Sequence, residues 1–345
     1  MRSHKYIIIS DYSDLRGGAA IVAKREFEVL RVTQKVQLWT INKHPVKLII
    51  LNFLLIFYLC FGWKFIVHTW SFFPFIKILA TVWPKKFIFV IHDYLLVCPN
   101  KALFDFQKNR RCTLTGYSKS CLRTDCGYTS GKKILHSFFN CMTKVQIRRC
   151  QFRFLSSYTK DLFESRYGPL KSIVQPNITM YDFTVSTRDK EMLSKHSLKR
   201  DAFLIFIGRE SMDKGYDRFQ DLKTNFIKVA CGPDKSADSS IKNLGWVDES
   251  SVITLAKNAK AIIYPSRQPD CDPLVQQLSE HFDIPFIVSN NNAATEFALK
   301  KFGSAAIVDK WETVSIDDRI ARTNAMNQPL HRRNISISQF YDQYF

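Results

Sequence analysis

The sequence lacks the patterns that mark most non-globular proteins. It has only 12 glycines and 12 prolines among 345 residues, which excludes collagen-like and low-complexity chains. We find no internal repeat, which excludes solenoids and propellers. The N-terminus is polar and then reads as a strand, without the apolar stretch and cleavage site of a secretory leader. We therefore expect a cytoplasmic protein whose nine cysteines are reduced thiols.

A full-length membrane span is also missing. The uncharged run Leu48–Trp63 has 16 residues and lies between Lys47 and Lys64. As a helix it is about 24 Å long at ~1.5 Å per residue, short of the ~30 Å of a bilayer core. A buried core helix, a helix at the membrane interface and a short span all stay open. Its apolar residues occur almost all round the helix, which favours burial.

Negative charge is scarce by comparison with positive charge. The formal net charge is +19, and between Lys101 and Lys171 there are 15 Lys and Arg against four Asp and Glu, a net charge of +11. Such a stretch indicates an anionic partner such as an acidic lipid or a phosphorylated substrate, or else a solvated basic face. We find no helix-turn-helix, zinc-finger or RNP string, so we expect no nucleic-acid partner.

Tight C-x-x-C pairs are absent as well. Cys98, Cys112, Cys121 and Cys126 have spacings of 14, 9 and 5 residues, unlike the paired ligands of zinc ribbons. Buried thiols are the favoured interpretation, and a metal site at these four cysteines is the alternative.

Short apolar strands alternate with helices in both halves of the chain. This pattern predicts an α/β fold with parallel sheets covered on both faces. It breaks between Pro176 and Arg200, so we predict one domain at 1–180, with a cysteine-bearing insertion at about 98–126. A second domain at 181–330 follows, and then a closing helix at 331–345. Strands predicted in the second domain are Phe203–Ile207, Phe226–Ala230, Ala261–Tyr264 and Pro285–Val288.

The candidate site residues follow strands, because ligands of such sheets bind outside the carboxyl ends of the strands. Gly17 and Gly18 either bring backbone N–H groups to a phosphate or form a flexible turn. His92 either meets a ligand or makes structural hydrogen bonds. Arg209 and Lys214 on one loop form either a diphosphate clamp or an ordinary charged surface.

The ordered set of these strings resembles the retaining GT-B glycosyltransferases of family 4, the glycosyl transferases group 1. The similar strings cover nearly the whole chain: Gly17-Gly18, Ile66–Trp70, His92–Pro99, Pro176-Asn177, Gly208–Gly215, Leu244-Gly245, Pro265-Ser266, Asp270–Pro285 and Ile335–Tyr344. The cysteine-bearing stretch resembles polysaccharide-assembly members. The resemblance implies two Rossmann-like domains that face each other across a cleft.

The resemblance also implies a role for each matching residue. His92 would contact the transferring sugar, Arg209 and Lys214 would neutralise the diphosphate leaving group, and Asp270 would bind sugar hydroxyls. The remaining implied substrate-binding residues are Gly17, Gly18, Gly245, Pro273, Leu274 and Val275. The cations would replace a metal ion, so we expect no cofactor.

One departure concerns the acidic residue that grips the ribose in the family. Leu278 stands at that position, and the nearby acidic residue is Glu280. Leucine accepts no hydrogen bond, so we predict a weak grip on the nucleoside and tighter donor binding in Leu278→Glu.

The resemblance, together with the charge and apolar patterns, implies a cytoplasmic hexosyltransferase, peripheral on the inner face of an anionic membrane. It would move a sugar from a nucleotide-sugar to a saccharide or lipid-linked acceptor in surface-polysaccharide biosynthesis. The alternatives are a catalytically weakened relative and a non-catalytic protein that binds polyanions or membranes.

Overall fold

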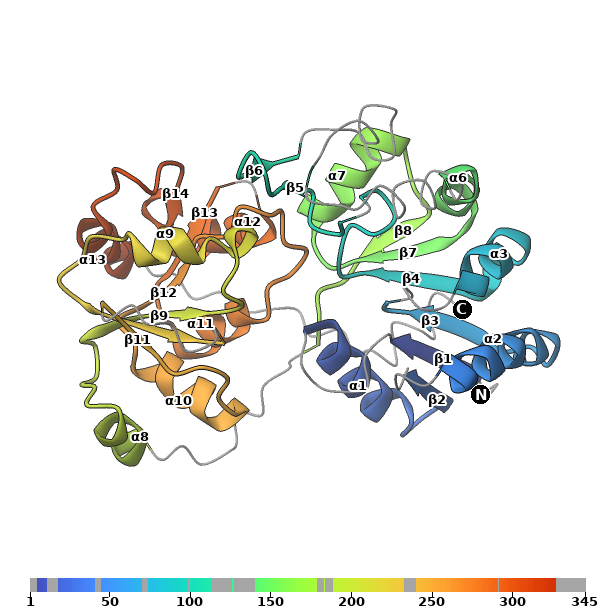
Figure 1. The fold of residues 1–345 in the computed structure, drawn as a ribbon, viewed down its shortest axis with the longest axis horizontal. Coiled ribbons are helices and arrows are strands. Elements are labelled where there is room, and N and C mark those ends of the chain that lie inside the picture. Colours follow the sequence, from blue (N-terminus) through green and yellow to red (C-terminus); the bar gives the residue numbers. More distant parts are fainter. Residues whose placement is uncertain are drawn as a thin grey trace. The chain divides into compact units, whose positions relative to one another are not determined.

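The computed structural model describes residues 5–10, 18–40, 45–69, 74–98, 100–112, 126, 140–178, 183, 189–232, 240–290 and 292–326. These residues form two compact units (Figure 1). Unit 1 contains the described residues from 5 to 101 and from 126 to 178. Unit 2 contains those from 102 to 112 and from 183 to 326. The helix predicted at 331–345 lies outside the described residues.

Unit 1 is built on a six-stranded parallel sheet. Its strand order is β2-β1-β3-β4-β7-β8. β2 lies on one side of β1 and the later strands lie on the other side, so the strand order reverses between β1 and β3. All five pairings are parallel. Its elements are β1 (Lys5–Ser10), α1 (Gly18–Leu30), β2 (Lys35–Thr40), α2 (Pro45–Cys60), β3 (Lys64–Val67), α3 (Pro74–Val82), β4 (Phe87–Ile91), α6 (Asn140–Arg149), β7 (Gln151–Phe154), α7 (Ser157–Tyr167) and β8 (Ser172–Val174).

Unit 2 repeats this architecture. Its sheet order, β11-β10-β9-β12-β13-β14, reverses between β9 and β12, and all its pairings are parallel. Helix α9 lies on one side of the sheet, and α8 and α10 lie on the other (Figure 1). Its elements are α8 (Asp189–Lys195), β9 (Phe203–Ile207), α9 (Tyr216–Gln220), β10 (Ile227–Cys231), β11 (Ile241–Asn243), α10 (Glu249–Asn258), β12 (Ala261–Tyr264), α11 (Val275–Phe282), β13 (Phe286–Ser289), α12 (Ala293–Phe302), β14 (Ile307–Val308) and α13 (Ile316–Met326).

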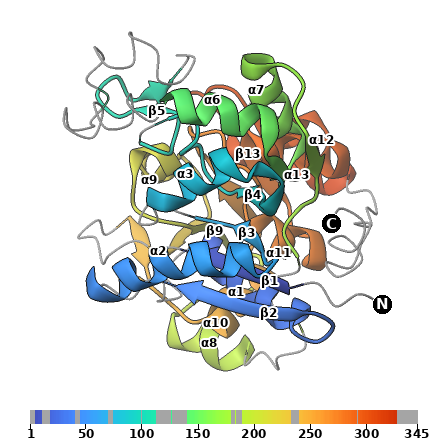
Figure 2. The ribbon, with the colours of Figure 1, turned by 90° about the vertical axis from the view of Figure 1, so that its right-hand side faces the viewer.

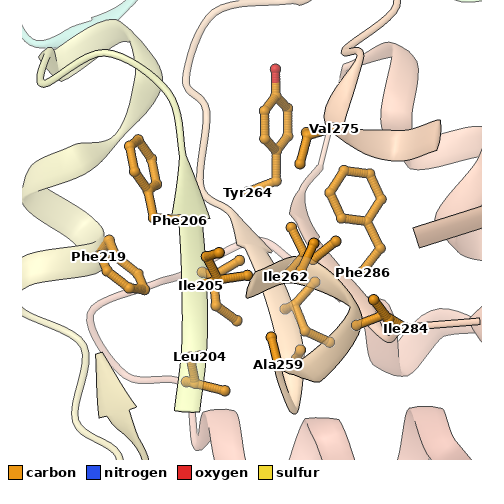
Figure 3. Packing of buried hydrophobic residues seen from close by; sticks show 14 of the residues in the cluster. Leu204, Ile205, Phe206, Phe219, Ala259, Ile262, Tyr264, Val275, Ile284 and Phe286 are labelled. Carbon is orange, nitrogen blue, oxygen red and sulfur yellow. The ribbon is translucent and has the colours of Figure 1, made fainter. Parts of the chain in front are cut away.

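The core of unit 2 explains why its strands are continuous apolar runs. Helices cover both faces of the sheet, so side chains of both faces are buried. Leu204, Ile205 and Ile262 have no exposed area. Figure 3 shows these side chains packed together, with the Tyr264 hydroxyl pointing away from the apolar cluster. This hydroxyl therefore brings a polar atom to the carboxyl end of β12.

The helices around the sheets begin at polar caps. The Asp248 side chain accepts a hydrogen bond from Ser251 N at the start of α10, and Asn292 forms a capping box at the start of α12. Ser156 caps α7 in the same way. Each cap satisfies a backbone N–H that has no partner within its own helix.

Where its side chains are described, helix α2 is buried on one side only. Leu55 and Leu59 are buried at 0% and 8% exposure, whereas Phe53 and Phe61 are 63% and 58% exposed. Ile50, Phe53, Leu54, Phe57 and Phe61 recur at helical spacing, and we call them the α2 outer face. The burial favoured by the sequence therefore applies to one side of α2. The side chains on its other side are apolar and exposed. Of the helices in the described part of the chain, none is long and apolar enough to span a bilayer.

Helices α2 and α3 pack beside each other in unit 1, and both face the viewer in Figure 2. Val82 at the end of α3 and Trp83 after it are 57% and 47% exposed. The exposed side chains of Lys85, Arg148 and Arg149 follow on the adjoining turn and on α6, which packs against α3. The exposed apolar end of α3 thus has cations beside it.

Candidate active site

In unit 2, two loops leave the sheet at the point where its strand order reverses. The loop after β9 carries Gly208 to Gly215, and the loop after β12 carries Pro265 to Leu274. Neighbouring loops at such a reversal run in opposite directions and leave a crevice that binds ligands in doubly wound sheets. The residues predicted for the donor are on these two loops.

Gly215 lets the two loops approach each other closely. Its φ is +73°, and a Cβ atom at this position would lie 2.1 Å from the Pro265 carbonyl oxygen. Any side chain would force the loops apart. Arg267 strengthens the contact, because its guanidinium donates to both carboxylate oxygens of Asp217 on α9, at 2.5 and 2.6 Å.

Asp270 lies at the centre of a buried polar cluster between the loops. Its Oδ1 accepts hydrogen bonds from Lys214 Nζ, at 2.5 Å, and from Gln268 Nε2. Its Oδ2 accepts from the hydroxyls of Ser266, at 2.8 Å, and Tyr264. Asp270 is 8% exposed, so a charge at this depth needs such partners. Both oxygens of the carboxylate predicted to bind sugar hydroxyls already have two donors each.

Electrostatics within this cluster favour an ionised Asp270. Burial alone would raise its pKa, but the Lys214 ammonium and the hydrogen bonds outweigh burial and lower the pKa of the carboxyl. Burial and the adjacent Asp270 charge raise the pKa of Tyr264 well above its usual range. The cluster therefore holds an anionic Asp270, a cationic Lys214 and a neutral Tyr264.

Arg209 is the more accessible of the two predicted cations. Its side chain is 62% exposed, and Nη2 lies 3.2 Å from Oδ2 of the buried Asp213. Lys214, on the same loop, is 20% exposed. The structure thus places both cations at the carboxyl edge of the sheet, each with its charged end paired to an aspartate.

Helix α11 begins beside this cluster with no side-chain cap. Leu274 precedes the helix and Val275 is its first residue, and N–H groups at this position have no acceptor within the helix. They also carry the positive end of the helix dipole, which favours an anion. Pro273, at the end of the loop, is buried.

Gly245, the remaining residue predicted for substrate binding in unit 2, follows β11. Its φ is +66°, and its carbonyl oxygen accepts a hydrogen bond from Gly232 N at 2.7 Å. Its own N–H donates to the Asn243 side chain at 3.0 Å. The structure therefore gives Gly245 a clear part in holding the loops after β10 and β11.

Leu278 lies on α11 and has no exposed area, because it packs in the core of unit 2. A glutamate there would bury its carboxylate instead of presenting it to a ribose. The geometry of α11 thus argues against the expected gain in donor binding from Leu278→Glu.

In unit 1, His92 follows β4 at the carboxyl edge of the sheet and is partly exposed. Its Nε2 lies 2.7 Å from Nδ1 of the buried His68, which follows β3. Gly18 is the exposed first residue of α1, and Gly17 lies outside the described residues.

The cysteine stretch gives no metal site within the part of the chain that the structure describes. No group of three or more His, Cys, Asp or Glu side chains there is arranged to hold a metal ion. Cys98 and Cys126 are buried, and the Cys98 thiol donates to Asn100 Oδ1 at 2.8 Å. Cys121 lies outside the described residues.

Sequence reasoning missed several polar residues of these clusters. Tyr264, Ser266 and Asp213 in unit 2 had no predicted role, and neither had Glu26 and Arg153, a buried ion pair beside His68 in unit 1. Arg153 did carry a signal, because it is a charged residue between two phenylalanines in a strand expected to be buried on both faces.

Two Rossmann-like units with parallel six-stranded sheets define the GT-B fold. Solved structures with this fold match nearly the whole chain. HepE from Anabaena, in complex with UDP and glucose, has a TM-score of 0.63 and 13% identity, with 99% of this chain and 95% of that chain covered.

Two further structures extend the likeness. Sucrose-phosphate synthase from Thermosynechococcus elongatus has a TM-score of 0.62 and 10% identity, covering 94% of this chain and 95% of that one. The UDP-forming α,α-trehalose-phosphate synthase from Burkholderia xenovorans, in complex with glucose-6-phosphate, has a TM-score of 0.56 and 11% identity. The match covers 99% of this chain and 98% of that chain. Neither a protein-family model nor the sequence of a curated protein matches this chain.

Proposed function

We propose that this protein is a retaining glycosyltransferase that moves a hexosyl group from a nucleotide-sugar to a saccharide or lipid-linked saccharide. The observation that carries the proposal is the set of groups at the strand reversal of unit 2. Arg209, Lys214 and the uncapped start of α11 bring two cations and free helix N–H groups to one edge of the sheet. This chemistry fits a diphosphate.

Names of the similar structures support the same class. Sucrose-phosphate synthase and trehalose-phosphate synthase are glycosyltransferases, and HepE binds UDP and glucose. We infer a nucleoside diphosphate sugar as the donor. The polysaccharide role rests on the sequence resemblance of the stretch from His92 to Cys126.

In the proposed reaction, the bond between the anomeric carbon and the diphosphate oxygen breaks. The acceptor oxygen bonds to the same face of that carbon, and its proton passes to the departing diphosphate. Arg209 and Lys214 stabilise the negative charge that develops on the leaving group. These two cations supply the charge that a metal ion supplies elsewhere, so the proposal needs no cofactor.

Asp270 acts in this proposal mainly through Lys214. Its four hydrogen-bond donors leave little capacity for sugar hydroxyls. Its charge instead holds the Lys214 ammonium at the mouth of the site. A bound diphosphate then competes with Asp270 for the same ammonium.

We further propose that unit 1 rests on an anionic membrane through the α2 outer face. Its aromatic and aliphatic side chains are exposed, and Lys85, Arg148 and Arg149 provide positive charge beside α3. Apolar side chains enter the interfacial region while cations attract acidic lipids. A lipid-linked acceptor would be reached from such a position, on the inner face of the membrane.

The test is a donor screen that measures nucleoside diphosphate released by the purified full chain. Wild type should turn over at least one nucleotide-sugar. Arg209→Ala and Lys214→Ala should each reduce turnover by about 10²–10³-fold, as losses of transition-state charge stabilisation do. Lys300→Ala is the matched control for Arg209, because both side chains are 62% exposed and ion-paired.

Other outcomes identify the alternatives. Wild-type turnover that both Ala variants retain overturns the diphosphate assignment. No turnover of any donor, combined with tight binding to acidic vesicles, favours the non-catalytic membrane-binding protein.

A further inference from the structure

Four polar side chains from four elements of unit 1 meet below the carboxyl edge of its sheet. Glu26 comes from α1, His68 and His92 follow β3 and β4, and Arg153 lies on β7. Glu26 and Arg153 have no exposed area, and His68 is 1% exposed. Only His92 of the four is partly exposed.

The contacts run in order from Arg153 to His92. Arg153 Nη1 donates to Glu26 Oε2 at 2.8 Å. The same carboxylate oxygen lies 3.6 Å from His68 Nε2. On the other side of the ring, His68 Nδ1 lies 2.7 Å from His92 Nε2. The planes of the two imidazole rings are inclined by 24°, with 4.9 Å between the ring centroids.

The Glu26 carboxylate discriminates between the two tautomers of His68. An Nε2–H bond of His68 is attracted to the carboxylate oxygen, whereas an Nε2 lone pair is repelled by it. Arg153 already balances the charge of Glu26, so a protonated His68 would add a buried positive charge to a neutral pair. With a single ring proton, His68 therefore carries it on Nε2 and keeps a lone pair on Nδ1.

His92 must then donate from Nε2 to complete the short contact with His68. Burial above all, and also the Arg153 charge, lower the pKa of His92 well below its usual range, and Glu26 opposes them only in part. His92 is thus neutral at pH 7 and has one ring proton. With that proton on Nε2, the other ring nitrogen, Nδ1, keeps a lone pair.

We propose that the Arg153–Glu26 pair sets the tautomer of His68 and, through it, makes His92 present Nδ1 as a hydrogen-bond acceptor. His68, Glu26 and Arg153 are positioning residues in this arrangement. Its chemical consequence rests on the proposed function: His92 accepts a hydrogen bond from a substrate hydroxyl and does not donate one.

The tautomers are measured without any substrate, by long-range ¹H–¹⁵N correlation spectra of the full chain with ¹⁵N-labelled histidine. The His92 signals are assigned by their loss in His92→Gln. We expect a protonated Nε2 and an unprotonated Nδ1 in His92 from about pH 6 to 8. A His92 that is protonated on Nδ1, or charged at pH 7, overturns the proposal.

Two variants of His68 form a matched pair. His68→Asn keeps a side-chain oxygen near the position of Nδ1 and should preserve the tautomer of His92. His68→Phe keeps the ring shape but removes the acceptor, and should give a mixture of His92 tautomers. A single His92 tautomer in His68→Phe contradicts the role of His68.

The double variant Glu26→Gln/Arg153→Met tests the ion pair without leaving one buried charge alone. We expect the tautomers of both histidines to become mixed, with a cooperative melting transition retained. Unchanged tautomers in this variant would show that Glu26 and Arg153 do not set the tautomers of the two histidines.

Kinetics then connect the tautomer to the reaction. In His68→Phe, kcat should fall in proportion to the fraction of His92 that no longer keeps its lone pair on Nδ1, while the donor KM changes little and His68→Asn stays near wild type. If no donor is turned over, the proposed function fails while the spectra still decide the tautomer.

Discussion

Asp270 and Lys214 show how one side chain determines what another is able to do. Their ion pair places a cation at the mouth of the unit 2 site, and Tyr264, Ser266 and Gln268 complete the shell of the carboxylate. A buried carboxylate with several donors is stabilised in its charged form. Changing it therefore affects both the stability of unit 2 and the position of Lys214.

Asp270→Asn should reduce the free energy of unfolding by about 1–3 kcal/mol at pH 7, because buried donors lose a charged acceptor. The folded-state pKa of Asp270 is lowered, so its contribution is present above the unfolded-state pKa and lost as pH falls through the folded value. The difference between wild type and variant should thus shrink below about pH 4. Urea unfolding at several pH values measures it.

Asp317→Asn is the control for this change. Asp317 also accepts hydrogen bonds, from Thr224 and Asn225, but it lies outside the donor cluster. It should leave the donor KM unchanged, whereas Asp270→Asn should raise it. Equal donor KM values in both variants would show that Asp270 does not contribute to donor binding.

Leu278→Glu should destabilise the protein by roughly 3 kcal/mol or more, because the carboxylate would enter a closed apolar core. Leu299→Glu is the matched control, since Leu299 is 50% exposed on α12, and its effect should stay within about 0.5 kcal/mol. Thermal or urea unfolding distinguishes the two. A stable Leu278→Glu protein that binds donor more tightly would indicate that residue 278 does lie at the nucleoside site.

At the scale of elements, alternation of apolar strands and helices was sufficient to predict both sheets. The short edge strands β8, β11 and β14 were not predicted, because two or three residues give no clear period. His92, Arg209 and Lys214 could be proposed from the sequence because they follow strands. Glu26 and Arg153 were missed because they are 127 residues apart in the sequence and only the folded sheet brings them together.

Helix α2 carries the prediction at this scale. Phe57→Gln/Phe61→Gln should lower binding to vesicles of phosphatidylglycerol and phosphatidylcholine by at least about tenfold, because two exposed rings leave the interface. The free energy of unfolding should change little. Co-sedimentation with vesicles measures the loss, and Trp246→Gln, at a 63% exposed aromatic residue of unit 2, is the control. Equal losses in both proteins would mean that α2 does not face the lipid.

At the scale of the whole molecule, the net charge of +19 governs association with anionic surfaces. Exposed Lys and Arg near acidic lipid contribute about 1 kcal/mol each, and salt screens this attraction. Binding to the acidic vesicles should therefore fall steeply between about 0.05 and 0.5 M salt, with a smaller salt-resistant part from α2. Equal binding to purely neutral vesicles would refute the electrostatic part.

The Arg153–Glu26 pair has a consequence for how the chain is made. Glu26 leaves the ribosome well before Arg153, since 127 residues separate them. Until Arg153 emerges, docking α1 on the sheet would bury a carboxylate without its counterion, which is strongly unfavourable. We therefore expect α1 to settle late in biosynthesis, after β7 has been added. Although domains usually fold from the N-terminal end as they are synthesised, α1 waits here for a strand that is synthesised after it.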